Sequence, residues 1–326
     1  GRQQGSRPAA EAALRKSLSL AKANGDRELT AEALLGLSDL LSSFGEFAVG
    51  EQHARAALVL CRQLQRPDLM ARALAALAWC VCCQGGYAEA ERCYRETLAI
   101  SETIANPFGI ALATNFLGWV AYCEGGARLA EAADLHVQAL AIWRRIGNRS
   151  FVAMCLGDCA LAAYELGDYV EAIRLAREGV TVAEELKQSD LLSYNLNVLG
   201  AATCRIGDLA ESRRHLFRSM QIAHERRMPD KAALMLYFLA QLFIQEGTIG
   251  AASSNQPAAQ QVAALELLAF VIDQPATWQV VRDRAARVQA DLLARLHPDA
   301  GAAAQARGRQ RSFDEIARTL LPELKG

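Results

Sequence analysis

The sequence predicts an all-α protein: a right-handed α-solenoid (superhelix) of about six to seven helix-turn-helix units, with a period of about 40 residues and a C-terminal helical cap. Two observations support this class. Hydrophobic residues make up 52% of the 326 residues and aromatic residues only 6%, and such an alanine- and leucine-rich composition is typical of close-packed helices. Glycine also recurs at intervals of 40, 40, 42, 40 and 40 residues, at Gly45, Gly85, Gly125, Gly167, Gly207 and Gly247.

Net charge, cysteine content and hydrophobicity indicate which partners and which cellular location to expect. The net charge is −1, with 35 basic and 36 acidic residues, so no general attraction to nucleic acid or to anionic membranes is expected. The nine cysteines are scattered along the predicted helices, which favours reduced thiols in a cytoplasmic protein. There is no apolar run of about 18 residues to span a membrane, and the N-terminus does not resemble a signal peptide. We therefore expect a cytoplasmic protein with no direct nucleic-acid or membrane partner.

The predicted repeat array covers residues 9–273. Residues 1–8 are polar and are expected to be a disordered N-terminal stub. Residues 9–23 form one helix, the second of a pair, so we expect the sequence to be a piece of a longer protein. The first helices of the next five pairs are expected at residues 28–43, 68–83, 108–123, 150–165 and 190–205. Their second helices are expected at residues 47–64, 87–104, 129–146, 169–186 and 209–226.

Cap residues and prolines place the starts of these helices. Pro67 and Pro107 suit the first turn of a helix, where a backbone N–H lacks a partner in any case. Asn106 and Asp68 lie beside them, and Asp or Asn side chains cap helix N-termini. The 42-residue interval comes from two extra residues within 124–128.

The last part of the chain departs from the repeat. A helix at about 231–246 is followed by a predicted flexible loop at 247–258 and a second helix near 260–273. Residues 274–326 are expected to be capping helices, at about 276–296, 300–306 and from Ser312 onward. Ser312 and Glu315 have the spacing of a capping box. A stack of repeats needs such an atypical end, because its last apolar face has no further repeat to cover it.

Several residue patterns resemble tetratricopeptide repeats. Leu117-Gly118 is followed by Tyr122, a glycine turn, and then Ala132, Ala139 and Leu140. Leu199-Gly200, Gly207-Asp208 and Gly167-Asp168-Tyr169 repeat parts of this pattern. The resemblance covers about residues 9–273. Its period is longer than the common 34 residues and is similar to that of the C-terminal sensor arrays of bacterial signal-transduction ATPases with numerous domains, which include transcriptional regulators.

This resemblance implies a sensor that binds a protein, peptide or small-molecule inducer and so controls an upstream nucleotide-switching module of the same polypeptide. The sequence itself has no G-x-x-x-x-G-K-[S/T] phosphate-binding motif. The alternative is a stand-alone adaptor scaffold that joins protein partners. An enzyme is a more distant alternative, since Asp39, Asp158 and Glu165 are the only carboxylates near the expected groove.

Helical periodicity predicts where a ligand binds. We measure the angle of each residue around the axis of its helix from the core residue of that helix. In each first helix, the residues two positions before, two positions after and five positions after the core residue lie at roughly 140° to 200°. They form one stripe on the side opposite the core. By resemblance, this stripe lines the concave groove, and aromatic and amide side chains suit a binding surface. The candidate groove residues are Trp79, Asn115, Trp119, Tyr122, Tyr164, Asn197, Tyr237 and Gln241. The alternative is that these rings pack against one another.

No metal or cofactor site is expected. Cys80 and Cys83 share a helix face, but no second Cys or His pair lies at ligand spacing, and tetrahedral zinc needs four ligands. His53, His136 and His215 recur on second helices and are interpreted as packing or surface residues.

Overall fold

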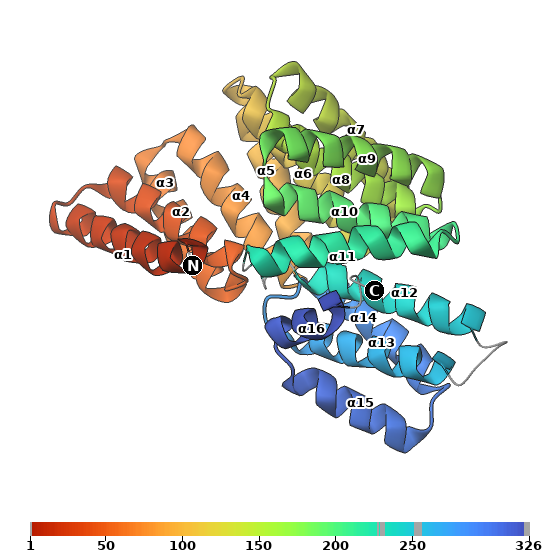
Figure 1. Ribbon diagram of the computed structural model, residues 1–326. Helices are drawn as coiled ribbons and strands as arrows, with labels where there is room; N and C mark the ends of the chain where they lie inside the picture. The colour runs from red at the N-terminus through yellow and green to blue at the C-terminus, as the bar shows by residue number, and fades with distance from the viewer. Residues whose placement is uncertain (1, 227, 229–231, 251–255, 323–326) are drawn as a thin grey trace. The chain divides into compact units, whose positions relative to one another are not determined.

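The computed structural model describes residues 2–226, 228, 232–250 and 256–322 (Figure 1). Within these residues the regular structure consists of α-helices and short 3-10 segments, with no strand. The all-α prediction is therefore confirmed. No helix in this part of the chain combines the length and the apolar character needed to cross a membrane.

The chain divides into two compact units, residues 1–148 and 149–326. Unit 1 contains α1 (Arg2–Ala23), α2 (Arg27–Ser43), α3 (Phe47–Leu64), α4 (Pro67–Cys83), α5 (Tyr87–Thr103), α6 (Pro107–Glu124), the 3-10 turn η1 (Gly126–Arg128) and α7 (Leu129–Arg145). Unit 2 contains α8 (Arg149–Glu165), α9 (Tyr169–Leu186), α10 (Ser189–Arg205), α11 (Leu209–Glu225), α12 (Ala232–Gly250), α13 (Gln256–Asp273), α14 (Gln279–Leu293), α15 (Pro298–Gln310) and α16 (Phe313–Leu320).

Helices α2 to α11 agree with the predicted ranges to within one residue at each end. Local capping explains this agreement. The carboxylate of Asp26 accepts a hydrogen bond from the Leu29 backbone N–H at 2.9 Å, and Asp168 and Asp208 cap α9 and α11 in the same way. Pro67 and Pro107 begin α4 and α6. These signals act within a few residues, so the sequence alone specifies them.

The ends of the chain differ from the prediction. Residues 2–8, expected to be disordered, belong to α1, since arginine and glutamine favour helix. Residues 247–250 and 256–258 of the expected loop belong to α12 and α13, and residues 251–255 lie outside the described residues. The capping box at α16 is present, with the Ser312 N–H donating to the Glu315 carboxylate at 2.7 Å.

Small residues let the two helices of each pair approach closely. The crossing positions Ala78, Ala160 and Ala240 are fully buried. At Gly200 a Cβ atom would lie 2.6 Å from Cγ of Leu216, and at Gly118 it would lie 2.9 Å from Cε1 of His136. Such distances are shorter than normal van der Waals contact, so glycine is required for this packing.

The cysteines serve as packing residues in this structure. All nine are free thiols and eight of them are buried. Burial raises the pKa of the Cys80 thiol, and likewise that of Cys204, to about 11. Both thiols are therefore protonated near neutral pH, the less nucleophilic state.

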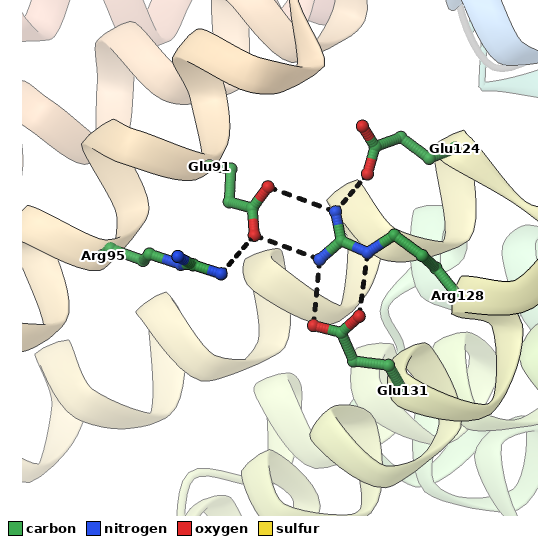
Figure 2. A network of polar contacts seen from close by, with 5 residues as sticks. All are labelled: Glu91, Arg95, Glu124, Arg128 and Glu131. Carbon is green, nitrogen blue, oxygen red and sulfur yellow. Dashed lines mark hydrogen bonds and ion pairs between the residues drawn. The ribbon is translucent and has the colours of Figure 1, made fainter.

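The two-residue insertion in unit 1 places Arg128 among three carboxylates, as Figure 2 shows. Arg128 donates to Glu131 on α7 at 2.8 and 2.9 Å and to Glu91 on α5 at 3.1 Å, and it also pairs with Glu124 on α6. Arg95 forms a further ion pair with Glu91 at 2.6 Å. Hydrogen bonding to Arg128 lowers the pKa of Glu131. Arg128 therefore links three consecutive helices of unit 1.

We predict that Arg128→Ala lowers the free energy of unfolding by about 1–2 kcal/mol, because it leaves three neighbouring carboxylates without their shared cation. Urea denaturation measures this loss. Since the pKa of Glu131 is lowered in the folded state, its stabilisation is present above the ordinary glutamate value of 4.5 and is lost as pH falls through the lowered pKa. The difference between variant and wild type should therefore shrink in acid.

Arg174→Ala is the matched control. Arg174 pairs with Glu171 and Glu178 on one helix face and is 60% exposed, so its loss should change stability by about 0.5 kcal/mol or less. Equal effects of the two substitutions would contradict a special role for Arg128.

Candidate functional site

The candidate groove residues fall in both units and most of them are buried. Trp79 lies on α4, and Asn115, Trp119 and Tyr122 lie on α6, all in unit 1. Tyr164 on α8, Asn197 on α10, and Tyr237 and Gln241 on α12 belong to unit 2. Trp79 and Gln241 are half-buried, and the other six are buried.

In unit 1 the candidate rings pack against their neighbours. Trp119 and Tyr122 stack with ring centroids 5.1 Å apart. Trp79 meets Phe116 edge to face at 5.4 Å, and Phe116 stacks on Tyr94 at 5.5 Å. These contacts favour the packing alternative for the unit 1 aromatics.

The buried amides also have structural surroundings. Asn115 Oδ1 lies 3.2 Å from Nδ1 of His136, a buried pair between α6 and α7. Asn197 lies beside a cavity of only about 40 Å³, which Tyr194 and Trp278 also line. Its Oδ1 atom is buried and has no hydrogen-bond partner among the described residues. This cavity has the size of a water site and is too small for a ligand.

In unit 2, three of the predicted residues do line one open pocket, with a volume of about 710 Å³. Tyr164 of α8 and both Tyr237 and Gln241 of α12 contribute to it. We call it the tyrosine pocket; its further lining residues are Glu165, Tyr169, Arg205, Ile244, Gln245, Thr248 and Val288. The wall therefore comes from the first helices α8, α10 and α12, the start of α9, and α14.

Hydrogen bonds and ring contacts fix the tyrosines. The Tyr164 hydroxyl donates to Gln241 Oε1 at 3.1 Å, which joins α8 to α12. The Tyr164 ring meets the Phe238 ring edge to face, with the ring centroids 5.7 Å apart. The centroid of the Tyr237 ring lies 5.4 Å from that of Phe238. Burial raises the pKa of both Tyr164 and Tyr237 above the ordinary tyrosine value. Both hydroxyls are therefore neutral near pH 7 and can donate or accept hydrogen bonds.

Three residues at equivalent positions give the pocket its charge pattern. Glu165, Arg205 and Gln245 occupy equivalent positions 40 residues apart; Glu165 and Arg205 are the last residues of α8 and α10, and Gln245 lies within α12. Glu165 forms an ion pair with Arg284 of α14, and both side chains are largely buried. Arg205 donates to the Tyr169 hydroxyl from Nε and Nη2, each at 3.1 Å.

Arg205, Gln245 and Tyr169 lie outside the set of residues that helical periodicity predicts to face a ligand. Cys204 and Ile244 lie five residues after the core residues Leu199 and Leu239, at positions of the predicted stripe. Arg205 and Gln245 directly follow them in the chain, so a wider stripe includes both. Tyr169 opens α9, and Val288 lies on α14 in the cap. Repeat periodicity cannot predict that Val288 lines the pocket, because α14 lies outside the repeats and its position depends on the packing of the cap.

The pocket offers recognition groups rather than a paired acid and base. Asp39 lies in unit 1, Asp158 accepts a hydrogen bond from the Tyr194 hydroxyl at 2.7 Å, and Glu165 is held by Arg284. Among the described residues, no three His, Cys, Asp or Glu side chains gather in a way that could hold a metal ion. The arrangement suits binding through apolar rings, amide groups and a guanidinium.

Two family models, both described as tetratricopeptide repeat, match residues 70–108 and 110–185. This part of the chain therefore consists of tetratricopeptide repeats, and the fold is an all-helical repeat array of that type. A search of curated proteins finds no matching sequence.

Solved structures share the fold at low sequence identity. A Rap protein complexed with Competence and Sporulation Factor is 14% identical, with a TM-score of 0.63 over 99% of this chain and 88% of that chain. NprR in complex with its cognate peptide NprX is 13% identical, with a TM-score of 0.58 over 98% of this chain and 97% of that one.

A signal-transduction ATPase with numerous domains from Pyrococcus horikoshii, which has a tetratricopeptide repeat sensor, is also similar. It is 14% identical, with a TM-score of 0.50, and the match covers 82% of this chain and 44% of that one. At these identities the likeness concerns the fold.

We predict that Trp119→Ala lowers the free energy of unfolding by about 3–5 kcal/mol, because it removes a buried ring from its stack on Tyr122. Trp79→Ala should cost less, since Trp79 is only half-buried. Thermal denaturation followed by circular dichroism measures both effects, with Val170→Ala, at a side chain that is 76% exposed, as the neutral control. An unchanged melting temperature for Trp119→Ala would contradict the packing interpretation.

Proposed function

We propose that this chain is a sensor domain that binds a short peptide in the tyrosine pocket. The pocket carries this proposal, because it contains three residues that periodicity predicted to face a ligand, Tyr164, Tyr237 and Gln241. Its volume of about 710 Å³ lies in the range of about 300–1,000 Å³ that is usual for ligand sites.

The lining groups match the chemistry of a peptide. Gln241 and Gln245 carry both donors and acceptors, as a peptide backbone does, and the neutral tyrosine hydroxyls can do the same. The rings of Tyr164 and Tyr237 supply apolar contact at a small entropic cost. The pocket is open at its mouth, which leaves room for an extended chain to continue beyond it.

The solved structures support a peptide over other ligand classes. Two proteins with this fold are described in complex with Competence and Sporulation Factor and with the peptide NprX. A third is described as a signal-transduction ATPase with a tetratricopeptide repeat sensor. We extend the proposal to a cytoplasmic bacterial regulator in which peptide binding controls a nucleotide-switching module of the same polypeptide.

The second candidate function is an adaptor scaffold for protein partners. Exposed apolar side chains favour it, since Leu166, Val170 and Ile206 are 49%, 76% and 53% exposed. A sensor should change the nucleotide hydrolysis of its attached module when the ligand is added. An adaptor should bind its partner with no such change.

We predict that the protein retains a subset of peptides from a randomised eight-residue library, and that Gln241→Ala combined with Gln245→Ala weakens their binding at least about tenfold. The physical reason is the loss of two amide groups that face the ligand. Fluorescence polarisation with the enriched peptides measures the affinity.

Gln221→Ala is the control, because Gln221 is exposed on α11 and its amide donates to Glu225 of the same helix. The control should bind as the wild type does. Retention of no peptide, or equal binding by the double variant, would contradict the proposal.

A further inference from the structure

Arg205 is a cation in the tyrosine pocket that has no carboxylate partner among the described residues. Its Nε and Nη2 atoms donate to the Tyr169 hydroxyl, and its guanidinium carbon lies 5.4 Å from the centroid of the Tyr169 ring. Both contacts are therefore made to a phenol ring and its hydroxyl, not to a carboxylate. An arginine cannot lose its proton in a protein, so this side chain brings a full positive charge to the pocket.

Nearby carboxylates are each held by a different arginine. Glu165, the other charged residue that lines the pocket, forms its ion pair with Arg284 of α14. Glu246, next to Gln245 in the chain, accepts hydrogen bonds from Arg213 at 2.8 and 3.1 Å. The positive charge of Arg205 is therefore not neutralised by these groups.

Other arginines that bridge consecutive repeats do find carboxylates. Arg55 pairs with Glu89 at 2.8 Å and Arg218 pairs with Glu184 at 2.6 Å. Arg205 also bridges two repeats, but it contacts a tyrosine instead. The contact holds the guanidinium in place while leaving its other N–H groups available, and a guanidinium with adjacent free N–H groups matches the two oxygens of a carboxylate.

We propose that Arg205 selects ligands that present a carboxylate to the tyrosine pocket. This inference rests on the proposed function, since it names the chemistry of the peptide that the same pocket takes. The carboxylate comes either from an Asp or Glu side chain or from the C-terminus of the peptide. Leu166 and Val170 lie near Tyr169 in the chain and Ile206 follows Arg205, all exposed, so apolar residues beside the carboxylate should strengthen binding.

The test uses four pools of synthetic eight-residue peptides on the immobilised chain. Two pools contain Asp and Glu, two contain Asn and Gln in their place, and each kind is made with a free or an amidated C-terminus. Mass spectrometry identifies the retained peptides, and fluorescence polarisation gives their affinities. We expect retention of carboxylate-bearing peptides; loss on amidation assigns the contact to the C-terminus, and loss on Glu-to-Gln exchange assigns it to a side chain.

Two substitutions at Arg205 test whether its guanidinium binds the carboxylate. Arg205→Gln should weaken the selected peptides at least about tenfold, because it removes a charge-assisted hydrogen bond. Arg205→Lys should recover part of this affinity, since it restores the charge without the planar fork. Added salt should weaken wild-type binding more than binding to Arg205→Gln. Arg205 is exposed, so the melting temperatures of both variants should stay near the wild-type value, which circular dichroism checks.

Arg214→Gln is the matched control. It removes the same charge in the same repeat, at a side chain that is 67% exposed and pairs with Glu211 on the surface of α11. Its affinity for the selected peptides should equal that of the wild type.

The possible failures are distinguishable. In the first case, neutral, amidated peptides bind as tightly as acidic ones, and Arg205→Gln does not change their affinity, but the Gln241 and Gln245 double variant weakens it. The carboxylate inference is then wrong, and the proposed peptide site is retained. If the wild type retains no peptide from any pool, or the double variant binds all of them normally, the proposed function fails and this inference fails with it.

Discussion

The structure depends on how closely the two helices of each pair approach one another. Gly118 and Gly200 sit where a Cβ atom would collide with His136 and Leu216, and alanine fills the equivalent positions in other pairs. Close approach brings the backbones together over a broad, apolar contact, which is the main source of stability for helices of this length. Each pair still has an apolar face that only the next pair can cover, and so the array is built by stacking.

The pocket in unit 2 is a consequence of this stacking. Because α8, α10 and α12 are equivalent helices of successive repeats, residues 40 positions apart in the chain become neighbours, as Glu165, Arg205 and Gln245 do. The cap then adds a wall that no repeat supplies, through Val288 and the Arg284 pair with Glu165. That ion pair neutralises the charge of Glu165 and leaves the charge of Arg205 unpaired with it, so the cap also affects the net charge of the pocket lining.

Unit 1 shows the opposite outcome for the same stripe of residues. There Trp79 of α4 meets Phe116 of α6 edge to face, Trp119 stacks on Tyr122 within α6, and Asn115 pairs with His136. A position on this stripe of a first helix therefore does not by itself leave a side chain open to solvent. The neighbours decide whether a ring is buried by the protein itself, and in unit 1 Phe116 and Tyr122 supply enough apolar surface to do so.

The sequence by itself determined the helices, their pairing and most of their ends, because caps, proline and helical periodicity act over a few residues or one repeat. Helical periodicity also placed Tyr164, Tyr237 and Gln241 on one predicted stripe, and these three residues line the tyrosine pocket. Only the tertiary structure decided which of the candidate residues share a pocket, that Arg205 belongs with them, and that α14 closes one side. These facts depend on contacts between residues as far apart as Glu165 and Arg284, and side-chain burial at that range is fixed by packing rather than by any local pattern.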